Sequence, residues 1–145
     1  MGTNIRPELS TINKYWIPKH RYYELKHFCL QYQDFKNQLE ELYSDGGYQA
    51  FIRVQRNKNM KSDPTFNLVA LREELRIKID LIESTAKLAD AELYDYILKA
   101  VTEEAPLHYL INVMGMPAGK NCFYDRYHKF FWLLDKKMGI QVTDS

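Results

Sequence analysis

The chain has 145 residues, of which 46% are hydrophobic and 27% are charged, and its formal net charge is +1. This composition is typical of a globular protein and excludes a disordered chain or one coated in basic residues. No stretch is apolar enough to predict a membrane span or a secretory signal. Because Cys29 and Cys122 lie far apart in the sequence, we expect two reduced thiols and a cytoplasmic protein.

The N-terminal quarter predicts an arm and one amphipathic helix. Residues 1–13 are polar and aperiodic, so we expect a mobile arm. Pro18 follows the apolar residues Tyr15, Trp16 and Ile17 and suits the first turn of a helix over residues 18–32. Steps of three and four residues place four side chains on one face of this helix, namely Tyr22, Leu25, Cys29 and Tyr32.

The following stretch predicts a second helix and then a connector. Phe35, Leu39 and Leu42 have helical spacing within a helix over residues 34–43. The run Ser44-Asp45-Gly46-Gly47 predicts a break. We expect residues 44–65 to form a flexible connector that holds at most one short element.

The clearest helical pattern lies in the middle of the chain. A helix of about 23 residues ending at Ala89 would be roughly 35 Å long. Asp90 then suits the cap of a helix over residues 91–101. The long helix has an apolar stripe with helical steps, made of Leu68, Leu71, Leu75, Ile79, Ile82, Ala86 and Ala89.

Every predicted element is helical, so the predicted fold class is all-α, a multi-helix domain with a C-terminal helix-turn-helix. We divide the chain into an arm (1–13), an N-terminal helical segment with the connector (14–62), and the long helix with the C-terminal helices (63–145).

The last forty residues predict function. A short helix over residues 106–114 ends at Gly115, which suits the left-handed conformation of a helix C-terminus, and Met116 is an apolar plug in the turn. After Pro117-Ala118-Gly119 a last helix begins, with Asn121 as its cap. Short helix, turn and second helix are the layout of a helix-turn-helix, although a plain αα-hairpin has the same spacing. The predicted stripe of the last helix has steps of three, four and four residues and consists of Phe123, Arg126, Phe130 and Leu134.

The start of the last helix is the expected DNA-reading surface. Asn can read adenine, whereas Lys reads guanine or grips a phosphate. Between Lys120 and Lys137 there are five basic residues against two acids. The residues predicted to project into the groove are Lys120, Asn121, Tyr124, Asp125 and His128. Arg126 and Lys129 are predicted to face the phosphate backbone.

This segment resembles the region-4 helix-turn-helix of sigma-70-type factors, as found in phage late-gene regulators of the ArpU and RinA kind. The runs KYWIPKHRYYELKHFCLQY and ADAELYDYILKAVTEE resemble prophage proteins of Firmicutes. The resemblance implies a phage transcription regulator that binds duplex DNA in the host cytoplasm, with host RNA polymerase or another host protein as its partner. The turn from Met116 to Phe123 is longer than in the family. The region-4 match rests on Leu110, Gly115-Met116, Phe123, Arg126, Phe130, Leu134 and the tail Lys136-Lys137.

Two other interpretations remain open. The first is a non-catalytic phage protein that binds a host complex, such as a CRISPR nuclease, and the second is a small assembly or packaging protein. His20, His27 and Cys29 lack the spacing of metal ligands, and no catalytic motif is present, so we expect neither a metal, a cofactor nor an enzyme. The basic and aromatic residues of the first helix either cover an aromatic core or add a nucleic-acid contact, and they are Lys19, His20, Arg21, Tyr23, Lys26 and His27.

The long helix also predicts a homodimer. Ile77, Leu81 and Leu88 lie off its main stripe and supply apolar surface beyond it. A single helix-turn-helix usually binds DNA weakly, and such proteins commonly bind as dimers with one unit on each half-site. The competing interpretation is a monomer in which the N-terminal helices cover that surface.

Overall fold

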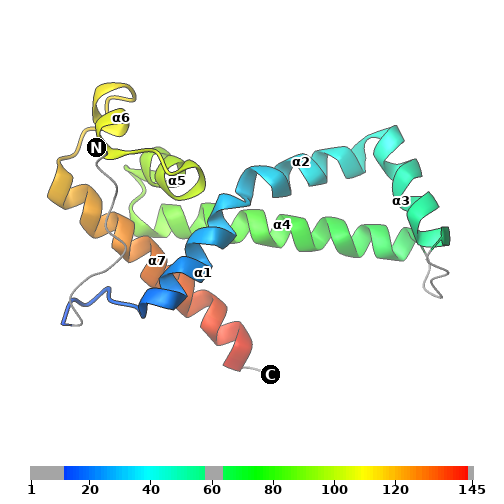
Figure 1. Cartoon of the computed structure of the whole chain (residues 1–145), viewed down its shortest axis with the longest axis horizontal. Helices are drawn as coiled ribbons and strands as arrows, with labels where there is room; N and C mark the ends of the chain where they lie inside the picture. The colour runs from blue at the N-terminus through cyan, green and yellow to red at the C-terminus, as the bar shows by residue number, and fades with distance from the viewer. Residues whose placement is uncertain (1–11, 58–63, 144–145) are drawn as a thin grey trace. The chain divides into compact units, whose positions relative to one another are not determined.

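The computed structural model describes residues 12–57 and 64–143, and the regular elements in these ranges are all α-helices (Figure 1). The predicted all-α class is therefore confirmed. No helix in the described ranges is both long and apolar enough to cross a membrane. The predicted arm falls almost wholly outside the described residues. In chain order the helices are α1 (Lys19–Leu30), α2 (Tyr32–Tyr43), α3 (Asp45–Asn57), α4 (Pro64–Ala89), α5 (Tyr94–Glu103), α6 (Leu107–Asn112) and α7 (Lys120–Thr143).

The chain forms two compact units that differ from the predicted segments. Unit 1 contains residues 1–31 and 81–145, and unit 2 contains residues 32–80. The boundaries differ because α1 packs against α5 and α7, which lie far along the chain. Such a long-range contact leaves no local mark in the sequence.

Unit 1 has an aromatic core built where α1, α5 and α7 meet. The predicted face of α1 is buried, including Tyr22 and Cys29. The hydroxyl oxygens of Tyr22 and Tyr127 are 2.7 Å apart. Burial raises the pKa of both phenols, so both remain protonated and one donates to the other. The hydrogen bond therefore pairs two polar groups that would otherwise be unsatisfied in the core.

The turn between α4 and α5 is held by Asp90. Its Oδ1 accepts hydrogen bonds from the backbone N–H groups of Glu92 (2.9 Å) and Leu93 (3.1 Å). The carboxylate thus satisfies donors of the turn, and α5 begins only at Tyr94. The prediction that Asp90 directly caps a helix starting at residue 91 was therefore wrong by three residues.

Unit 2 contains a helix where the sequence predicts a break. Ser44 ends α2 and caps α3, because its Oγ accepts the N–H of Gly47 (3.0 Å). A Cβ on Gly47 would lie 1.8 Å from the carbonyl oxygen of Glu41. The glycine is thus needed for the close approach of α3 to α2 rather than for a loop. The expected connector over 44–65 is mostly α3, and residues 58–63 lie outside the described ranges.

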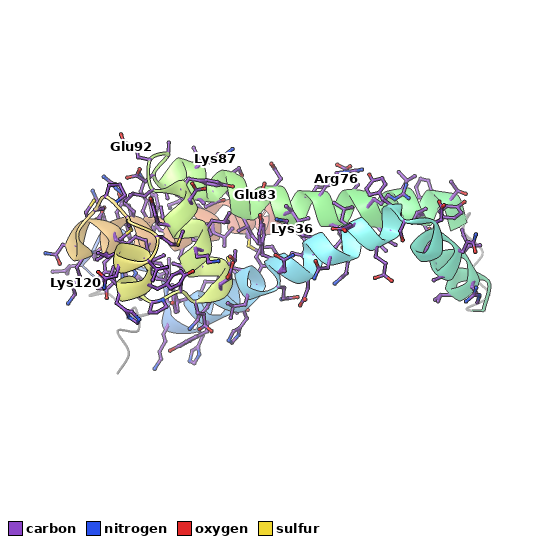
Figure 2. The ribbon with its side chains drawn as sticks, turned by 90° about the horizontal axis from the view of Figure 1, so that it is seen from above. Lys36, Arg76, Glu83, Lys87, Glu92 and Lys120 are labelled. Carbon is purple, nitrogen blue, oxygen red and sulfur yellow. The ribbon has the colours of Figure 1, made fainter. Side chains whose placement is uncertain are left out.

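The first half of α4 packs beside α2 within unit 2. Arg72 Nη2 donates to the carbonyl oxygen of Leu42 (2.6 Å), which belongs to the last turn of α2. The Arg72 guanidinium lies 4.2 Å from the ring centre of Tyr43, and that of Arg76 lies 5.3 Å from it. Figure 2 shows Arg76 on α4 beside α2. Arg72 and Arg76 of α4 thus hold the C-terminal end of α2 through one hydrogen bond and two cation–π contacts. The buried apolar residues of unit 2 are Tyr32, Phe35, Leu68 and Leu75.

Candidate nucleic-acid interface

The connection between α6 and α7 has the predicted glycine turn. Gly115 has a φ of 72°, the left-handed conformation that favours glycine. The N–H of Met116 donates to the carbonyl oxygen of Leu110 (2.9 Å), and the Met116 side chain is buried. The left-handed conformation predicted for Gly115 and the buried apolar position predicted for Met116 are therefore confirmed. The helix before them is shorter than predicted, since α6 covers only Leu107–Asn112.

The arrangement around this turn does not confirm a helix-turn-helix. That motif needs its turn to fix the second helix across the first. Here the helices that pack most closely on α7 are α1 and α5, rather than α6. The position of α7 is thus set by the aromatic core of unit 1.

The buried face of α7 differs from the predicted stripe at one position. Phe123, Phe130 and Leu134 are fully buried, as predicted. The fourth member is Tyr127 rather than Arg126. Because Tyr127 completes the helical steps and hydrogen-bonds to Tyr22, it takes the place in the core. Arg126 lies at the edge of this face.

The first two turns of α7 present a polar surface. Lys120, Asn121 and Asp125 are exposed, and Tyr124 is half-buried. The ammonium of Lys120 lies 5.9 Å from the ring centre of Tyr124, and Figure 2 marks Lys120 at the start of the helix. Asn121 does not cap α7, because the helix already includes it and the Phe123 N–H bonds to the Gly119 carbonyl oxygen (3.0 Å). The structure brings these four predicted residues together.

His128 does not belong to this surface. It is only 8% exposed, and it contacts the ring of Tyr127 edge-on. Burial lowers the pKa of His128 to about 4, although the nearby Asp125 carboxylate acts in the opposite direction. The imidazole is thus neutral at pH 7. The prediction that His128 projects into a groove conflicts with this burial.

The two predicted backbone-facing cations have different surroundings. Arg126 Nε lies 3.3 Å from Asp90 Oδ2, and Arg126 Nη1 lies 3.3 Å from Asp125 Oδ2. Its charge is therefore largely compensated. Lys129 is half-buried, and within residues 12–57 and 64–143 neither it nor Lys120 forms an ion pair. Lys120 and Lys129 are the uncompensated cations of the predicted set.

The basic residues of α1 are partly used inside unit 1. Arg21 Nε donates to Asp135 Oδ1 on α7 (2.6 Å), and Lys26 Nζ lies 2.9 Å from Glu104 Oε1 after α5. These ion pairs hold α1 on its neighbours. They favour the interpretation in which this face covers the aromatic core.

One cluster of aromatic and basic residues was missed in the sequence. Tyr15, before α1, packs against Trp132 of α7 with ring centres 5.5 Å apart. The ammonium of Lys136 lies 4.4 Å from the Trp132 ring centre. The spacing of Trp132 and Lys136, one helical turn apart, was the available signal. The sequence around Tyr15 contains no pattern that predicts its contact with Trp132, because the two residues lie far apart in the chain.

Among the described residues, no group of three or more His, Cys, Asp or Glu side chains is arranged to hold a metal ion. Comparison with known proteins gives no family model, no curated protein and no solved structure with significant similarity to the chain.

Proposed function

We propose that the protein is a DNA-binding transcription regulator that reads duplex DNA with the first two turns of α7. The observation that carries this proposal is the polar surface at the start of a helix whose opposite face is buried in the aromatic core. A helix start of this kind is the part that reaches base edges when a helix enters the major groove. The aromatic core beneath would hold it rigidly.

The exposed side chains suit distinct contacts with a duplex. Asn121 has the donor and acceptor pair that recognises adenine, and Lys120 suits guanine or a phosphate. Lys129, further along α7, suits the phosphate backbone. In this proposal Arg126 positions α7 through Asp90 instead of gripping phosphate. Lys120 and Asn121 therefore carry specificity, and Lys129 carries affinity.

From the resemblance to phage late-gene regulators we further propose that this activity occurs in the cytoplasm of a host cell, with host RNA polymerase as the protein partner. The helix-turn-helix assignment belongs to the same proposal, with α6 as its first helix. The function needs no cofactor, because groove contacts and phosphate contacts come from side chains alone.

Random-site selection on duplex DNA with the purified protein tests the proposal directly. Enrichment of one motif supports sequence-specific binding, whereas no enrichment and no gel shift at low salt would exclude it. In a titration, log K should fall with log salt by about 0.9 for each phosphate contact.

Three variants test which contacts the residues of α7 make with DNA. We expect Asn121→Ala to relax the base preference and to lower affinity for the selected site by about tenfold, a loss of about 1.4 kcal/mol. Lys129→Ala should weaken selected and unrelated duplexes equally. The matched control is Lys99→Ala, which removes a lysine that pairs with Glu103 on α5 (2.9 Å) and should leave both affinities unchanged.

A second candidate function is non-catalytic binding to a host protein. It is favoured by an apolar strip on α4 in unit 2, where Phe66, Val69 and Ile77 are 68%, 56% and 53% exposed. Their helical spacing puts them on one side of α4. Exposed apolar strips mark protein contacts. A host protein that co-purifies with the chain should be retained by Lys120→Ala and lost by the Val69→Glu/Ile77→Glu double variant if this candidate holds.

A further inference from the structure

The aromatic and basic cluster before α1 and on α7 forms a continuous surface within unit 1. We define this lysine–aromatic surface as Lys14, Tyr15, Trp132 and Lys136. The Lys14 ammonium lies 5.0 Å from the Tyr15 ring centre, and the Tyr15 and Trp132 rings meet edge-on at 5.5 Å. The Lys136 ammonium lies 4.4 Å from the Trp132 ring centre. The surface thus alternates cation, ring, ring and cation.

The charge of this surface is positive. Lys14 and Lys136 are both exposed, whereas Tyr15 and Trp132 are half-buried. The neighbouring acid, Asp135, is paired with Arg21 (Nε to Oδ1, 2.6 Å), so its negative charge is compensated. The two ammonium groups can therefore attract an anion at the edge of the rings.

We propose that the lysine–aromatic surface binds single-stranded nucleic acid, at a site separate from the start of α7. Sites of this class combine basic groups for the backbone with aromatic rings on which unpaired bases stack. Each lysine lies over a ring, which is a contact of modest strength at an exposed position. On binding, the ammonium groups move to phosphates and bases occupy the ring faces.

The pairing of two rings with two lysines favours a single strand over other ligands. In a duplex the base faces are stacked on one another, so they are not open to Tyr15 or Trp132. An acidic peptide would satisfy the lysines but has no flat ring system to exchange for the cation–π contacts. Trp16, beside Tyr15 and 38% exposed, offers a further aromatic face.

Fluorescence anisotropy of a labelled 15-nucleotide oligo-dT with the full-length protein tests this site. We expect the Lys14→Ala/Lys136→Ala double variant to weaken binding about tenfold. Its salt slope should be lower by about 1.4, which is 0.7 for each of two lost phosphate contacts on a single strand. The matched control is Lys87→Ala, because the Lys87 ammonium lies 5.1 Å from the ring centre of Tyr94 in the same kind of contact and is labelled on α4 in Figure 2. It should bind like the wild type.

The role of the ring is tested separately from that of the charges. Trp132→Phe should keep most of the affinity, whereas Trp132→Leu should lose about tenfold because stacking is lost. Circular dichroism checks that each variant is folded. If Trp132→Leu unfolds, the surface lysine variants still decide the question.

The outcomes separate this site from duplex reading by α7. Lys120→Ala and Asn121→Ala should leave oligo-dT affinity unchanged, so either site can fail alone. The proposal is overturned if the wild type does not bind oligo-dT at 50 mM salt, or if Lys87→Ala loses as much affinity as the double lysine variant. Binding of a poly-glutamate peptide, sensitive to the double lysine variant and without any oligo-dT binding, would also overturn it and assign the surface to a protein partner.

Discussion

At the residue scale, His128 shows how a polar side chain can be misassigned from position alone. Its place in the third turn of α7 puts it near the exposed residues in sequence, one turn after Tyr124. His128 shares a helix face with Tyr124 but lies further along α7, at a level where its side chain is buried. Helix periodicity alone therefore does not separate His128 from the exposed residues, because residues four apart share a face.

Burial of His128 predicts a loss of stability in acid. The folded-state pKa of about 4 is below the ordinary 6.5, so the unfolded chain binds the proton more tightly between these values. The stabilisation is complete above pH 6.5 and is lost as the pH falls towards 4, by up to about 3 kcal/mol. Urea unfolding at pH 7.0, 5.5 and 4.5 measures it. His128→Phe should flatten this part of the profile. An equal pH dependence in both proteins would contradict the assignment.

At the element scale, helices with strong periodicity were predictable and their partners were not. The stripe of α4 and the face of α1 follow from spacing alone, because burial of one helix face requires it. α3 was missed because two adjacent glycines disfavour a helix by propensity. Its existence depends on the Ser44 cap and on close packing against α2. The start of α7 was foreseen from its sequence, whereas the neighbours that hold it depend on contacts with α1 and α5.

The two glycines of α3 should respond in opposite ways to the same substitution. Gly47→Ala places a Cβ against the Glu41 carbonyl oxygen and should destabilise the protein by about 1–3 kcal/mol. Gly46→Ala meets no atom within 4 Å and should stabilise α3 by up to about 1 kcal/mol, because alanine is the better helix former. Thermal unfolding followed by circular dichroism compares them. Equal effects would mean that α3 does not approach α2 in solution.

At the scale of the whole molecule, we expect two copies of the chain to pair through the apolar strip of unit 2. The strip is defined by Phe66, Val69 and Ile77, and pairing would remove it from water without a foreign partner. Light scattering at micromolar concentration should give about twice the chain mass of 17.3 kDa. The Val69→Glu/Ile77→Glu variant should return to the single-chain mass, whereas Lys120→Ala should not. A wild-type mass equal to that of one chain would exclude the dimer and leave the strip to another protein.

The carboxylate of Asp90 serves two structures at once, since Oδ1 holds the turn before α5 while Oδ2 faces Arg126. Under the proposed function, this carboxylate stabilises the turn and at the same time lowers the affinity of α7 for a polyanion, because it compensates the charge of Arg126. Asp90→Asn keeps an oxygen for the turn but removes one of the two carboxylates paired with Arg126, the other being that of Asp125. Under the proposed function it should raise affinity for every duplex alike and steepen the salt dependence by up to about 0.9. A duplex titration against salt would reveal this as tighter binding with an unchanged ratio between the affinities for selected and unrelated duplexes. Under the proposed function, the compensated arginine of the wild-type chain leaves base discrimination to the Asn121 amide and the Lys120 ammonium.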